Sequence, residues 1–278
     1  MIRLALAAPR EQGALVSEPY DRWVLPDGSV RAEFHRRGDD FLLRFLDEAD
    51  FEISVPDNQV IVHPVAGFDE ADCHSLFENA VTPVLGNHAG GLFLHGSAVA
   101  VGEHGIAFLG LSRSGKTTLA GAFARSGHPF LTEDVIDLEA KGGEYWIRPN
   151  SSALRLFPDS AEYLLGCGAG MDEDDEKQAF DGGAELPFSK RALPLKALFV
   201  LGDDHDAALA IERRAPGKAL TSLLPHAFIL DVEDRKRMRG HFDRLADLSE
   251  QVAVHTLDYP RTYSALPDVC SAIIEACS

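Results

Sequence analysis

The feature that most constrains this chain is the octapeptide GLSRSGKT at residues 110–117. An apolar run, Ile106–Leu109, precedes it, and a run that suits a helix, Thr117–Arg125, follows it and ends before Gly127. A strand, a glycine loop and a helix in this order match the whole pattern G-x-x-x-x-G-K-[ST] of a phosphate-binding loop. The sequence therefore predicts an α/β domain with a phosphate site at the end of a buried strand. The alternative is a glycine-rich turn with an exposed lysine.

Eight residues of this segment are expected to bind nucleotide. Glycines permit the turn that points backbone N–H groups at a phosphate, and the helix N-terminus adds a positive dipole. Lys116 is expected to reach the β- and γ-phosphate oxygens, and Thr117 to offer its hydroxyl to Mg²⁺. The predicted nucleotide contacts are Gly110, Ser112, Arg113, Ser114, Gly115, Lys116, Thr117 and Thr118.

Two adjacent acids, Glu133 and Asp134, follow the next predicted strand, Pro129–Thr132. Phosphoryl transfer needs Mg²⁺ to neutralise charge and often needs a carboxylate that accepts the proton of the acceptor, so the pair could divide these roles. We therefore predict both acids and Lys116 as catalytic, and both acids with Thr117 as metal ligands. The alternative is a solvated acid pair, which is common in an acidic chain.

A histidine and two arginines are further candidates. His95 lies in the predicted strand Leu92–Val101 and is a candidate catalytic residue, although a lone histidine on an apolar strand is more often a satisfied core residue. Arg148 and Arg155 lie on predicted strands after the acid pair and could bind a phosphate or an anionic peptide end of the substrate. A surface ion pair is the alternative for each arginine.

The charge balance excludes one class of partner. The chain has 26 Lys and Arg against 44 Asp and Glu, a net charge of −18. A surface of that sign repels a phosphate backbone, so sequence-independent binding of DNA or RNA is not expected. No apolar run is long enough to cross a bilayer, and the apolar stretch at the start is too short for a signal peptide. We expect a cytoplasmic protein with no nucleic-acid or membrane partner.

The pattern along the chain predicts two domains, a small α+β domain at residues 1–88 and a larger one at 89–278. Short apolar runs predict an antiparallel β unit in the first, and a helix follows up to a glycine-rich break. The predicted segments are the β unit at 41–63, a helix at 69–85, the break at 86–91, strands at 144–148, 153–157, 196–201 and 252–257, a surface loop at 166–176, and helices at 218–224, 235–248 and 266–276.

The order of these motifs resembles a known family. Leu94–Gly96, the loop at 110–117 and Gly127–Asp134 are similar to the catalytic core of HPr kinase/phosphorylase, with specific likeness over residues 92–137. The resemblance implies an α/β P-loop core of the kind shared with ATP-dependent phosphoenolpyruvate carboxykinase. It also implies that His95 lies near the γ-phosphate and that Glu133 and Asp134 form the family's acidic pair.

A closer resemblance extends over most of the chain. Four segments, Ile147–Pro149, Leu154–Asp159, Leu193–Leu201 and Leu257–Arg261, are similar to the HPr-kinase-like proteins of lasso-peptide gene clusters. Those enzymes use ATP to phosphorylate a serine, commonly the C-terminal one, of a precursor peptide. The resemblance implies a small β-rich N-terminal domain before the kinase core.

Three departures from the family are visible. Glu133 stands where the family usually has aspartate, which leaves open which acid is the base and which serves the metal. Thr118 stands where HPr kinase has an acidic residue. The glycine-rich signature that is associated with phosphorylase activity is not visible, so dephosphorylation is not predicted.

We therefore expect a kinase that uses ATP and Mg²⁺ to phosphorylate a serine hydroxyl of a short ribosomal precursor peptide. One alternative is a carboxykinase-like or small-molecule phosphotransferase, because the core resemblance does not fix the acceptor. Another is a non-catalytic module that senses ATP, which would have no use for a base. The residues leave open the number of phosphates added and the oligomeric state.

Overall fold

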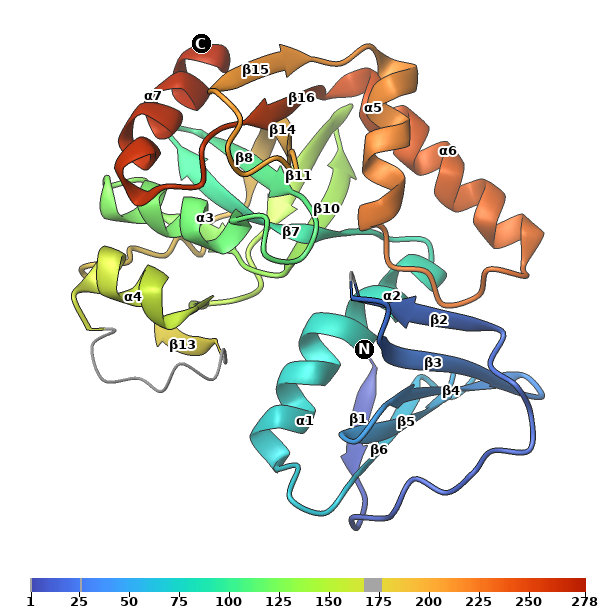
Figure 1. The fold of residues 1–278 in the computed structure, drawn as a ribbon. Helices are drawn as coiled ribbons and strands as arrows, with labels where there is room; N and C mark the ends of the chain where they lie inside the picture. The colour runs from blue at the N-terminus through green and yellow to red at the C-terminus, as the bar shows by residue number, and fades with distance from the viewer. Residues whose placement is uncertain (1, 26, 168–176) are drawn as a thin grey trace. The chain divides into compact units, whose positions relative to one another are not determined.

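The computed structural model describes residues 2–25, 27–167 and 177–278 of the chain (Figure 1). Strands and helices are mixed throughout, which confirms the predicted α/β class. The surface loop predicted at 166–176 lies outside the described residues from position 168 onward. No helix in the described part of the chain is long and apolar enough to span a membrane.

The chain divides into two compact units. Unit 1 consists of Met1–Leu85 and the short segment Leu230–Val232, and unit 2 consists of Gly86–Ile229 and Glu233–Ser278. The small segment from late in the chain belongs to unit 1 through contacts such as the hydrogen bond from Tyr20 Oη to the carbonyl oxygen of Leu230, at 2.5 Å. Nothing in the local sequence pattern indicates that residues 230–232 belong to unit 1.

Unit 1 is built on one six-stranded sheet with the order β1-β6-β5-β4-β3-β2. The three strands over residues 40–64 pair antiparallel, which confirms the β unit predicted at 41–63. The first three strands were not predicted, and β1 pairs with β6 in parallel. The elements are β1 (Arg3–Leu6), β2 (Asp21–Val24), β3 (Val30–Arg37), β4 (Asp40–Phe45), β5 (Ala49–Ser54), β6 (Gln59–Pro64), α1 (Glu70–Leu76), a π-helical turn (Phe77–Val81) and α2 (Thr82–His88).

Unit 1 contains a group of polar and charged side chains around the buried Asp50 and Arg44, which we call the Asp50 cluster: Arg10, Gln12, Arg44, Asp50 and Glu52. Arg44 donates to Asp50 through Nε at 2.8 Å and through Nη2 at 2.9 Å. Arg10 Nη2 and Gln12 Nε2 donate to the same carboxylate at 3.1 and 3.0 Å. Burial alone would raise the pKa of Asp50, but the two arginines outweigh it and hold this pKa below its usual value. Asp50 is therefore a buried anion that is paired with cations.

Unit 2 is built on an eight-stranded sheet in which β8, β14 and β16 lie side by side and parallel. β11 pairs with β14 as well as with β10, so β11-β10-β7-β8-β14 forms a closed ring of strands (Figure 1). The strands are β7 (Leu92–Val101), β8 (His104–Leu109), β9 (Phe130–Thr132), β10 (Val135–Lys141), β11 (Glu144–Arg148), β14 (Leu193–Leu201), β15 (Ala210–Arg213) and β16 (Ala253–Asp258), with β12 (Ala153–Leu156) and β13 (Gln178–Asp181) in a separate pair.

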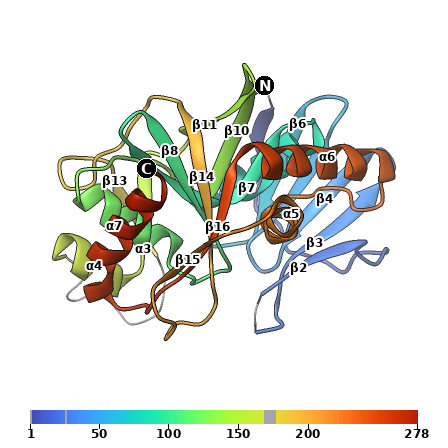
Figure 2. The same cartoon turned by 90° about the horizontal axis from the view of Figure 1, so that it is seen from above.

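The strand before the glycine loop is buried on both faces, which explains its continuous apolar run. Ile106 and Phe108 of β8 belong to one core, with residues of α3 and α7. Ala107 and Leu109, on the other face, belong to a second core with residues of β7, β10 and α6. The sheet therefore separates two apolar layers, with α3, α4 and α7 on one side and α5 and α6 on the other (Figure 2).

The helices of unit 2 follow the predicted pattern with one omission. The helix after the glycine loop begins at Lys116 and ends at Arg125, and Gly127 adopts a φ of +89° just beyond it, as predicted. The helix at 158–165 was not predicted, because Phe157 was assigned to a strand; it instead caps a helix that begins at Pro158, a favoured first position. The helices are α3 (Lys116–Arg125), α4 (Pro158–Leu165), α5 (Pro216–Leu223), α6 (Arg235–Gln251) and α7 (Leu266–Ala276), with 3₁₀ turns at Leu224–His226 and Tyr263–Ala265.

The glycine-rich break predicted at 86–91 is shorter than expected, because α2 continues through Gly86 to His88. A Cβ atom at Gly86 would lie 2.2 Å from the ring of Phe93, so this position requires glycine for close packing and not for a turn. The break itself is at Gly90, where φ is +101°. A glycine inside a helix was therefore misread as a helix end.

Candidate active site

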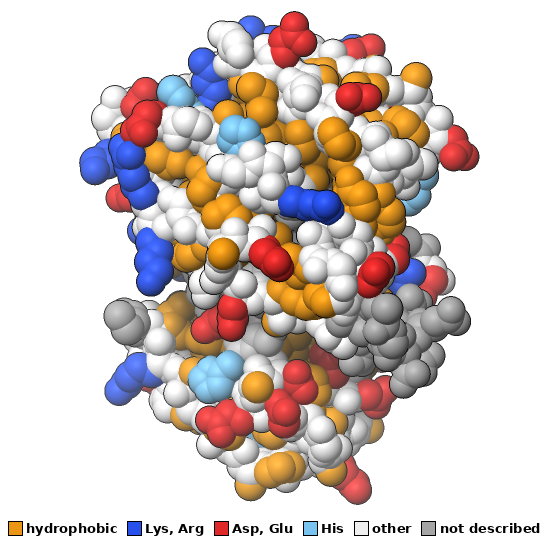
Figure 3. Space-filling view, turned by 90° about the vertical axis from the view of Figure 1, so that its left-hand side faces the viewer, with side chains coloured by type: hydrophobic (Ala, Val, Ile, Leu, Met, Phe, Trp, Pro, Cys, Tyr) orange, Lys and Arg blue, Asp and Glu red, His pale blue; other side chains and the backbone are white. Residues whose placement is uncertain are grey.

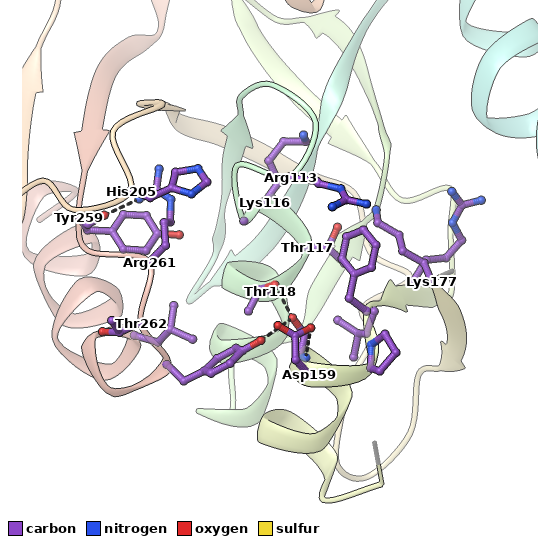
Figure 4. A pocket seen from close by; sticks show the side chains of 18 residues that line it. Arg113, Lys116, Thr117, Thr118, Asp159, Lys177, His205, Tyr259, Arg261 and Thr262 are labelled. Carbon is purple, nitrogen blue, oxygen red and sulfur yellow. Dashed lines mark hydrogen bonds between the residues drawn. The ribbon is translucent and has the colours of Figure 1, made fainter. Parts of the chain in front are cut away.

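Three parallel strands of unit 2 end at the same edge of the sheet. β8, β14 and β16 end at Leu109, Leu201 and Asp258, and their registers place these ends level with one another. Ligands of α/β sheets bind at the carboxyl ends of parallel strands. The segments that follow these strands, the glycine loop among them, surround a cavity of about 450 Å³ (Figure 4). This volume is typical of a small-molecule site.

The lining of this pocket is cationic, although the chain carries a net charge of −18. Five of the lining residues are Arg or Lys and one is Asp. On the face drawn in Figure 3, acidic side chains lie scattered among neutral and apolar ones. A pocket of the opposite sign to the whole chain favours an anionic ligand. The lining residues are Arg113, Gly115–Thr118, Arg155–Ser160, Lys177, His205, Tyr259, Arg261–Tyr263 and Leu266.

The glycine loop adopts the backbone that its sequence permits. Gly115 caps α3 with a φ of +95°, and a Cβ atom there would lie 3.0 Å from Tyr259 Oη. A Cβ atom at Gly110 would lie 2.4 Å from Ser114 Oγ. No side chain caps the N-terminus of α3, so its first N–H groups remain available to an anion.

Lys116, at the start of α3, is buried, with 6% of its surface exposed. Its Nζ donates to the carbonyl oxygens of Gly110 at 3.0 Å and Leu111 at 2.9 Å. Burial lowers the pKa of Lys116 to about 8, although the charge of Asp134 opposes this effect. A phosphate next to this ammonium would favour its charged form, so the site gains electrostatic stabilisation when an anion enters.

The acid pair, Glu133 and Asp134, follows β9 and turns back to face the loop. Thr117 Oγ1 donates to Glu133 Oε1 at 2.8 Å, and both acids are buried. Asp134 has a φ of +62°, a region that is uncommon for residues other than glycine and that clusters at functional sites. Its carbonyl oxygen accepts from the N–H of Gly96 on β7 at 3.1 Å, which fixes this turn.

The two acids differ in their preferred protonation state. Burial raises the pKa of Glu133, and the neighbouring charge of Asp134 raises it further. Burial acts on Asp134 in the same direction, but the cations Lys177 and Arg155 outweigh it and hold the pKa of Asp134 below its usual value. Asp134 is therefore the ionised member of the pair, and Glu133 is the one that more readily holds a proton.

Two cations contact the acid pair. Arg155 Nη2 lies 3.2 Å from Asp134 Oδ2. Lys177 Nζ lies 3.4 Å from Glu133 Oε1 and 3.9 Å from Asp134 Oδ1, and 5.7 Å from the ring centroid of Phe157. Lys177 was missed in the sequence because it is a single lysine after the acidic run at 172–176, with no motif around it.

His95 lies on β7 opposite Val135, beside the acid pair. Its ring packs edge-on against Phe228, with the ring centroids 6.2 Å apart. Burial lowers the pKa of His95 to about 4, and the charge of Lys116 adds to this effect. His226 is also buried, and burial with the nearby His95 and Lys116 lowers its pKa to about 4. Both imidazoles are therefore neutral near pH 7, and sequence reasoning missed His226.

The two candidate arginines lie in different surroundings. Arg155 lines the pocket and contacts Asp134, as described above. Arg148 Nε and Nη2 donate to the carboxylate of Asp137, both at 2.9 Å, and Arg148 is not among the pocket residues. Asp137 and Arg148 face each other across β10 and β11, so the structure favours the surface ion pair for Arg148.

Of the eight predicted nucleotide contacts, five line the pocket: Arg113, Gly115, Lys116, Thr117 and Thr118. Gly110, Ser112 and Ser114 belong to the loop but do not line it. Residue patterns did not identify the opposite wall, although the resemblance segments 154–159 and 257–261 include part of it, because its residues follow β12, β14 and β16 and reach the loop only through the tertiary fold. The missed wall residues are Phe157, Pro158, Asp159, Ser160, His205, Tyr259, Arg261 and Tyr263.

The wall formed after β16 carries polar groups directed at the loop. Arg261 stacks on Tyr259, with Cζ 3.7 Å from the ring centroid, and donates through Nη2 to the carbonyl oxygen of Gly202 at 2.7 Å. Its Nε is buried and has no hydrogen-bond partner among the described residues. Figure 4 shows His205, Tyr259 and Arg261 on one side of the pocket and Arg113 and Lys177 on the other.

No protein-family model and no curated protein matches this sequence. Among solved structures, that of the Hpr(Ser) kinase/phosphatase from Coxiella burnetii is similar at a TM-score of 0.39 and 12% sequence identity. The match covers 66% of this chain and 94% of that one. A likeness at this level does not assign a function.

Proposed function

We propose that this chain is an ATP-dependent phosphotransferase that transfers the γ-phosphoryl group to a hydroxyl, and that the hydroxyl belongs to a serine of a short ribosomally made peptide. The observation that carries the proposal is the hydrogen bond of 2.8 Å between Thr117, in the glycine loop, and Glu133. It joins a phosphate-binding loop to a buried acid pair whose second member, Asp134, is ionised. A loop that only binds phosphate has no need of that pair.

The chemistry of the donor set suits Mg²⁺. Thr117, Glu133 and Asp134 supply hard oxygen atoms close to one another. Among the described residues, no three or more His, Cys, Asp or Glu side chains form a metal site by themselves. Mg²⁺ is commonly bound through one or two carboxylates together with substrate phosphates. When bound here, the ion would neutralise charge on the β- and γ-phosphates.

The residues of the site suggest a division of labour. The free N–H groups at the start of α3 and the ammonium of Lys116 would bind the phosphates. Asp134 is ionised and can accept a proton, whereas Glu133 is hydrogen-bonded to Thr117, whose hydroxyl is the other expected metal ligand. We therefore propose Asp134 as the general base and Glu133 as the Mg²⁺ ligand. His95 is neutral and can donate a hydrogen bond to the transferring group.

In the proposed step, the acceptor hydroxyl oxygen forms a bond to the γ-phosphorus while the bond from that phosphorus to the bridging oxygen of ADP breaks. The hydroxyl proton passes to the carboxylate of Asp134, and the bridging electron pair leaves with ADP. Little covalent chemistry is asked of the protein, so catalysis depends on positioning and charge stabilisation.

The far side of the pocket suits the nucleoside. Tyr259, Arg261 and His205 lie across the pocket from Lys177, so a phosphate chain at the loop would point its sugar and base toward them. Tyr263 and Ser160 also line the pocket, with Ser160 Oγ 3.2 Å from Tyr263 Oη. Aromatic and hydroxyl groups of this kind bind a purine nucleoside in many sites.

The peptide acceptor is supported by the sequence resemblance at 147–149, 154–159, 193–201 and 257–261. Two of these segments contribute to the pocket: Arg155–Asp159, and Tyr259 with Arg261. The resemblance therefore includes the surroundings of the reacting groups as well as the glycine loop.

The test is ADP formation by the purified chain with ATP and Mg²⁺ and one acceptor at a time. The acceptors are the precursor peptide encoded beside this gene, free serine and a small dicarboxylate. Turnover that depends on the peptide and its serine supports the proposal. Turnover with a small acceptor alone indicates a small-molecule or carboxykinase-like enzyme. ATP binding without turnover, unchanged in Asp134→Asn, indicates an ATP sensor.

A further inference from the structure

Lys177 contacts an oxygen that the proposed metal site also needs. Its Nζ lies 3.4 Å from Glu133 Oε1, the same atom that accepts the hydrogen bond from Thr117 Oγ1. A magnesium ion held by that hydroxyl and that carboxylate would need the same carboxylate oxygen that Lys177 contacts. An ammonium group and a divalent cation repel each other at such distances, so they cannot both keep this contact.

The contact of Lys177 is loose compared with other buried ion pairs of the chain. Its two distances to the acid pair, 3.4 and 3.9 Å, exceed the 2.8 and 2.9 Å by which Arg44 contacts Asp50. Charge-assisted hydrogen bonds are usually about 2.7–2.9 Å long. Lys177 also reaches the acids on a flexible four-carbon stem. It is therefore held by charge more than by geometry.

The place to which Lys177 can move is the pocket itself. It lines the cavity with Arg113, Lys116 and Arg155, close to the glycine loop that would hold the phosphates. A terminal phosphate is the nearest anion that a bound nucleotide would bring to this wall. A lysine that leaves the carboxylate would find a new partner there without a large displacement of the backbone.

We propose that Lys177 and Mg²⁺ compete for the Glu133 carboxylate, and that Lys177, once displaced, binds the terminal phosphate of the nucleotide. This inference rests on the proposed function. Lys177 would then weaken metal binding by itself and strengthen binding of a triphosphate relative to a diphosphate. A lysine with a purely structural role would support the folded site, and its removal would weaken both ligands together.

The experiment compares wild type, Lys177→Met and Lys177→Arg by isothermal titration calorimetry, with Lys190→Met as the matched control. Lys190 is exposed and does not line the pocket. Mg²⁺ is titrated into the protein saturated with ADP. In a second series the dissociation constants of ADP and of the non-hydrolysable analogue AMPPNP are measured at saturating Mg²⁺. Melting temperatures are recorded for all four proteins.

In Lys177→Met the affinity for Mg²⁺ is expected to rise, and the preference for a triphosphate over a diphosphate is expected to fall. Lys177→Met binds Mg²⁺ at least about fivefold more tightly, because a positive charge some 4 Å away is gone. The same variant loses the preference for AMPPNP over ADP that wild type shows, while Lys177→Arg and Lys190→Met behave as wild type. A melting temperature equal to that of wild type excludes a folding effect.

Unchanged or weaker Mg²⁺ binding in Lys177→Met, or an undiminished preference for AMPPNP, would overturn the inference and leave the proposed function standing. Failure of wild type to bind either nucleotide would overturn both. A variant that fails to fold is replaced by Lys177→Gln, which keeps a polar group of similar length. Lys177→Gln must also bind Mg²⁺ more tightly and lose the preference for AMPPNP.

Discussion

Both units contain buried carboxylates beside cations, but the two groups are built differently. Asp50 in unit 1 accepts four hydrogen bonds of 2.8–3.1 Å from Arg44, Arg10 and Gln12. The acid pair of unit 2 accepts one short bond, from Thr117, and its cations lie 3.2–3.9 Å away. Asp50 is therefore fully paired, whereas Glu133 and Asp134 share Lys177 at longer distances.

The difference also appears in the pKa values. The arginines hold the pKa of Asp50 below its usual value in spite of burial. At Glu133 the effect of burial exceeds that of the nearby cations, and the pKa is raised. At Lys116 it exceeds that of the nearby carboxylates, and the pKa falls to about 8. Perturbed groups of this kind gather where a ligand or a proton has to be exchanged, whereas complete pairing stabilises the fold. The comparison therefore separates a fully paired ion cluster from one whose groups are perturbed in the way that is typical of functional sites.

The largest effect is expected for Asp134→Asn. Loss of the base should lower turnover by roughly 10²–10⁴-fold, while ATP affinity changes little. Asparagine tolerates the left-handed backbone at this position, and the cations that lose their partner, Arg155 and Lys177, are partly exposed to water, so the melting temperature should fall only slightly. Steady-state kinetics, nucleotide titration and thermal melting measure the three quantities. A marked drop in melting temperature with turnover retained would show that Asp134 stabilises the fold as Asp50 does, and would contradict the distinction between the two groups.

Removal of the loop ammonium in Lys116→Ala should lower turnover by roughly 10²–10³-fold, because charge at the transferring phosphoryl group is no longer stabilised. Nucleotide affinity should fall as well, unlike in Asp134→Asn. Its Nζ donates to two carbonyl oxygens of the loop, and burial disfavours its charge, so stability should change little. Lys190→Met is the control. Full turnover in Lys116→Ala would show that the nucleotide does not bind at this loop.

The Asp50 cluster should respond in the opposite way. Asp50→Asn leaves the buried Arg44 with no full countercharge and should lower the free energy of unfolding by about 3 kcal/mol or more. Urea unfolding measures this change. Nucleotide affinity and turnover, measured on the folded fraction, should match wild type. Equal losses of stability in Asp50→Asn and Asp134→Asn would mean that the two groups do not differ in role.

The smallest effect concerns pH. Burial lowers the pKa of His241 to about 4 from a usual 6.5, and neither ring nitrogen has a hydrogen-bond partner among the described residues. The unfolded chain binds a proton here below pH 6.5 and the folded chain does not. The stability from this group is therefore present above pH 6.5 and is lost as the pH falls towards 4.

The measurement is the free energy of unfolding from pH 7 to pH 4 for wild type, His241→Gln and the exposed control His104→Gln. His241→Gln should lose up to about 1.4 kcal/mol per pH unit of the wild-type slope within this window. The slope of His104→Gln should equal that of wild type. Equal slopes in all three proteins would contradict the assignment of a buried neutral histidine.

Local patterns of the sequence account for the half of the site that lies close together in the chain. The strand at 106–109, the glycine loop and the helix up to Arg125 were predicted because each is specified by its own residues, and the strand in the structure begins two residues earlier, at His104. Glu133 and Asp134 follow the next strand, and the hydrogen bond from Thr117 brings the acid pair to the loop. Short separation along the chain made these contacts predictable.

The other half depends on strand order, which local patterns do not encode. Tyr259 and Arg261 meet the loop only because β14 lies between β8 and β16 in the sheet. Arg148 looked like Arg155 in the sequence, and only the register of β10 with β11 reveals its pairing with Asp137. β3 does alternate, with Val30, Ala32 and Phe34 on one face and polar residues between them, so its pattern was present in the sequence and was overlooked; β1 has only four residues, too few to show a pattern.

The most direct test of the central claim is the intact mass of the precursor peptide after incubation with the purified chain, ATP and Mg²⁺. Lys116→Ala and Asp134→Asn are run in parallel. The account predicts a mass gain of one phosphoryl group on the wild-type reaction, located on serine by fragmentation, with little or none for either variant. Equal gain with Asp134→Asn, or no gain on any hydroxyl acceptor while ATP remains bound, would contradict it.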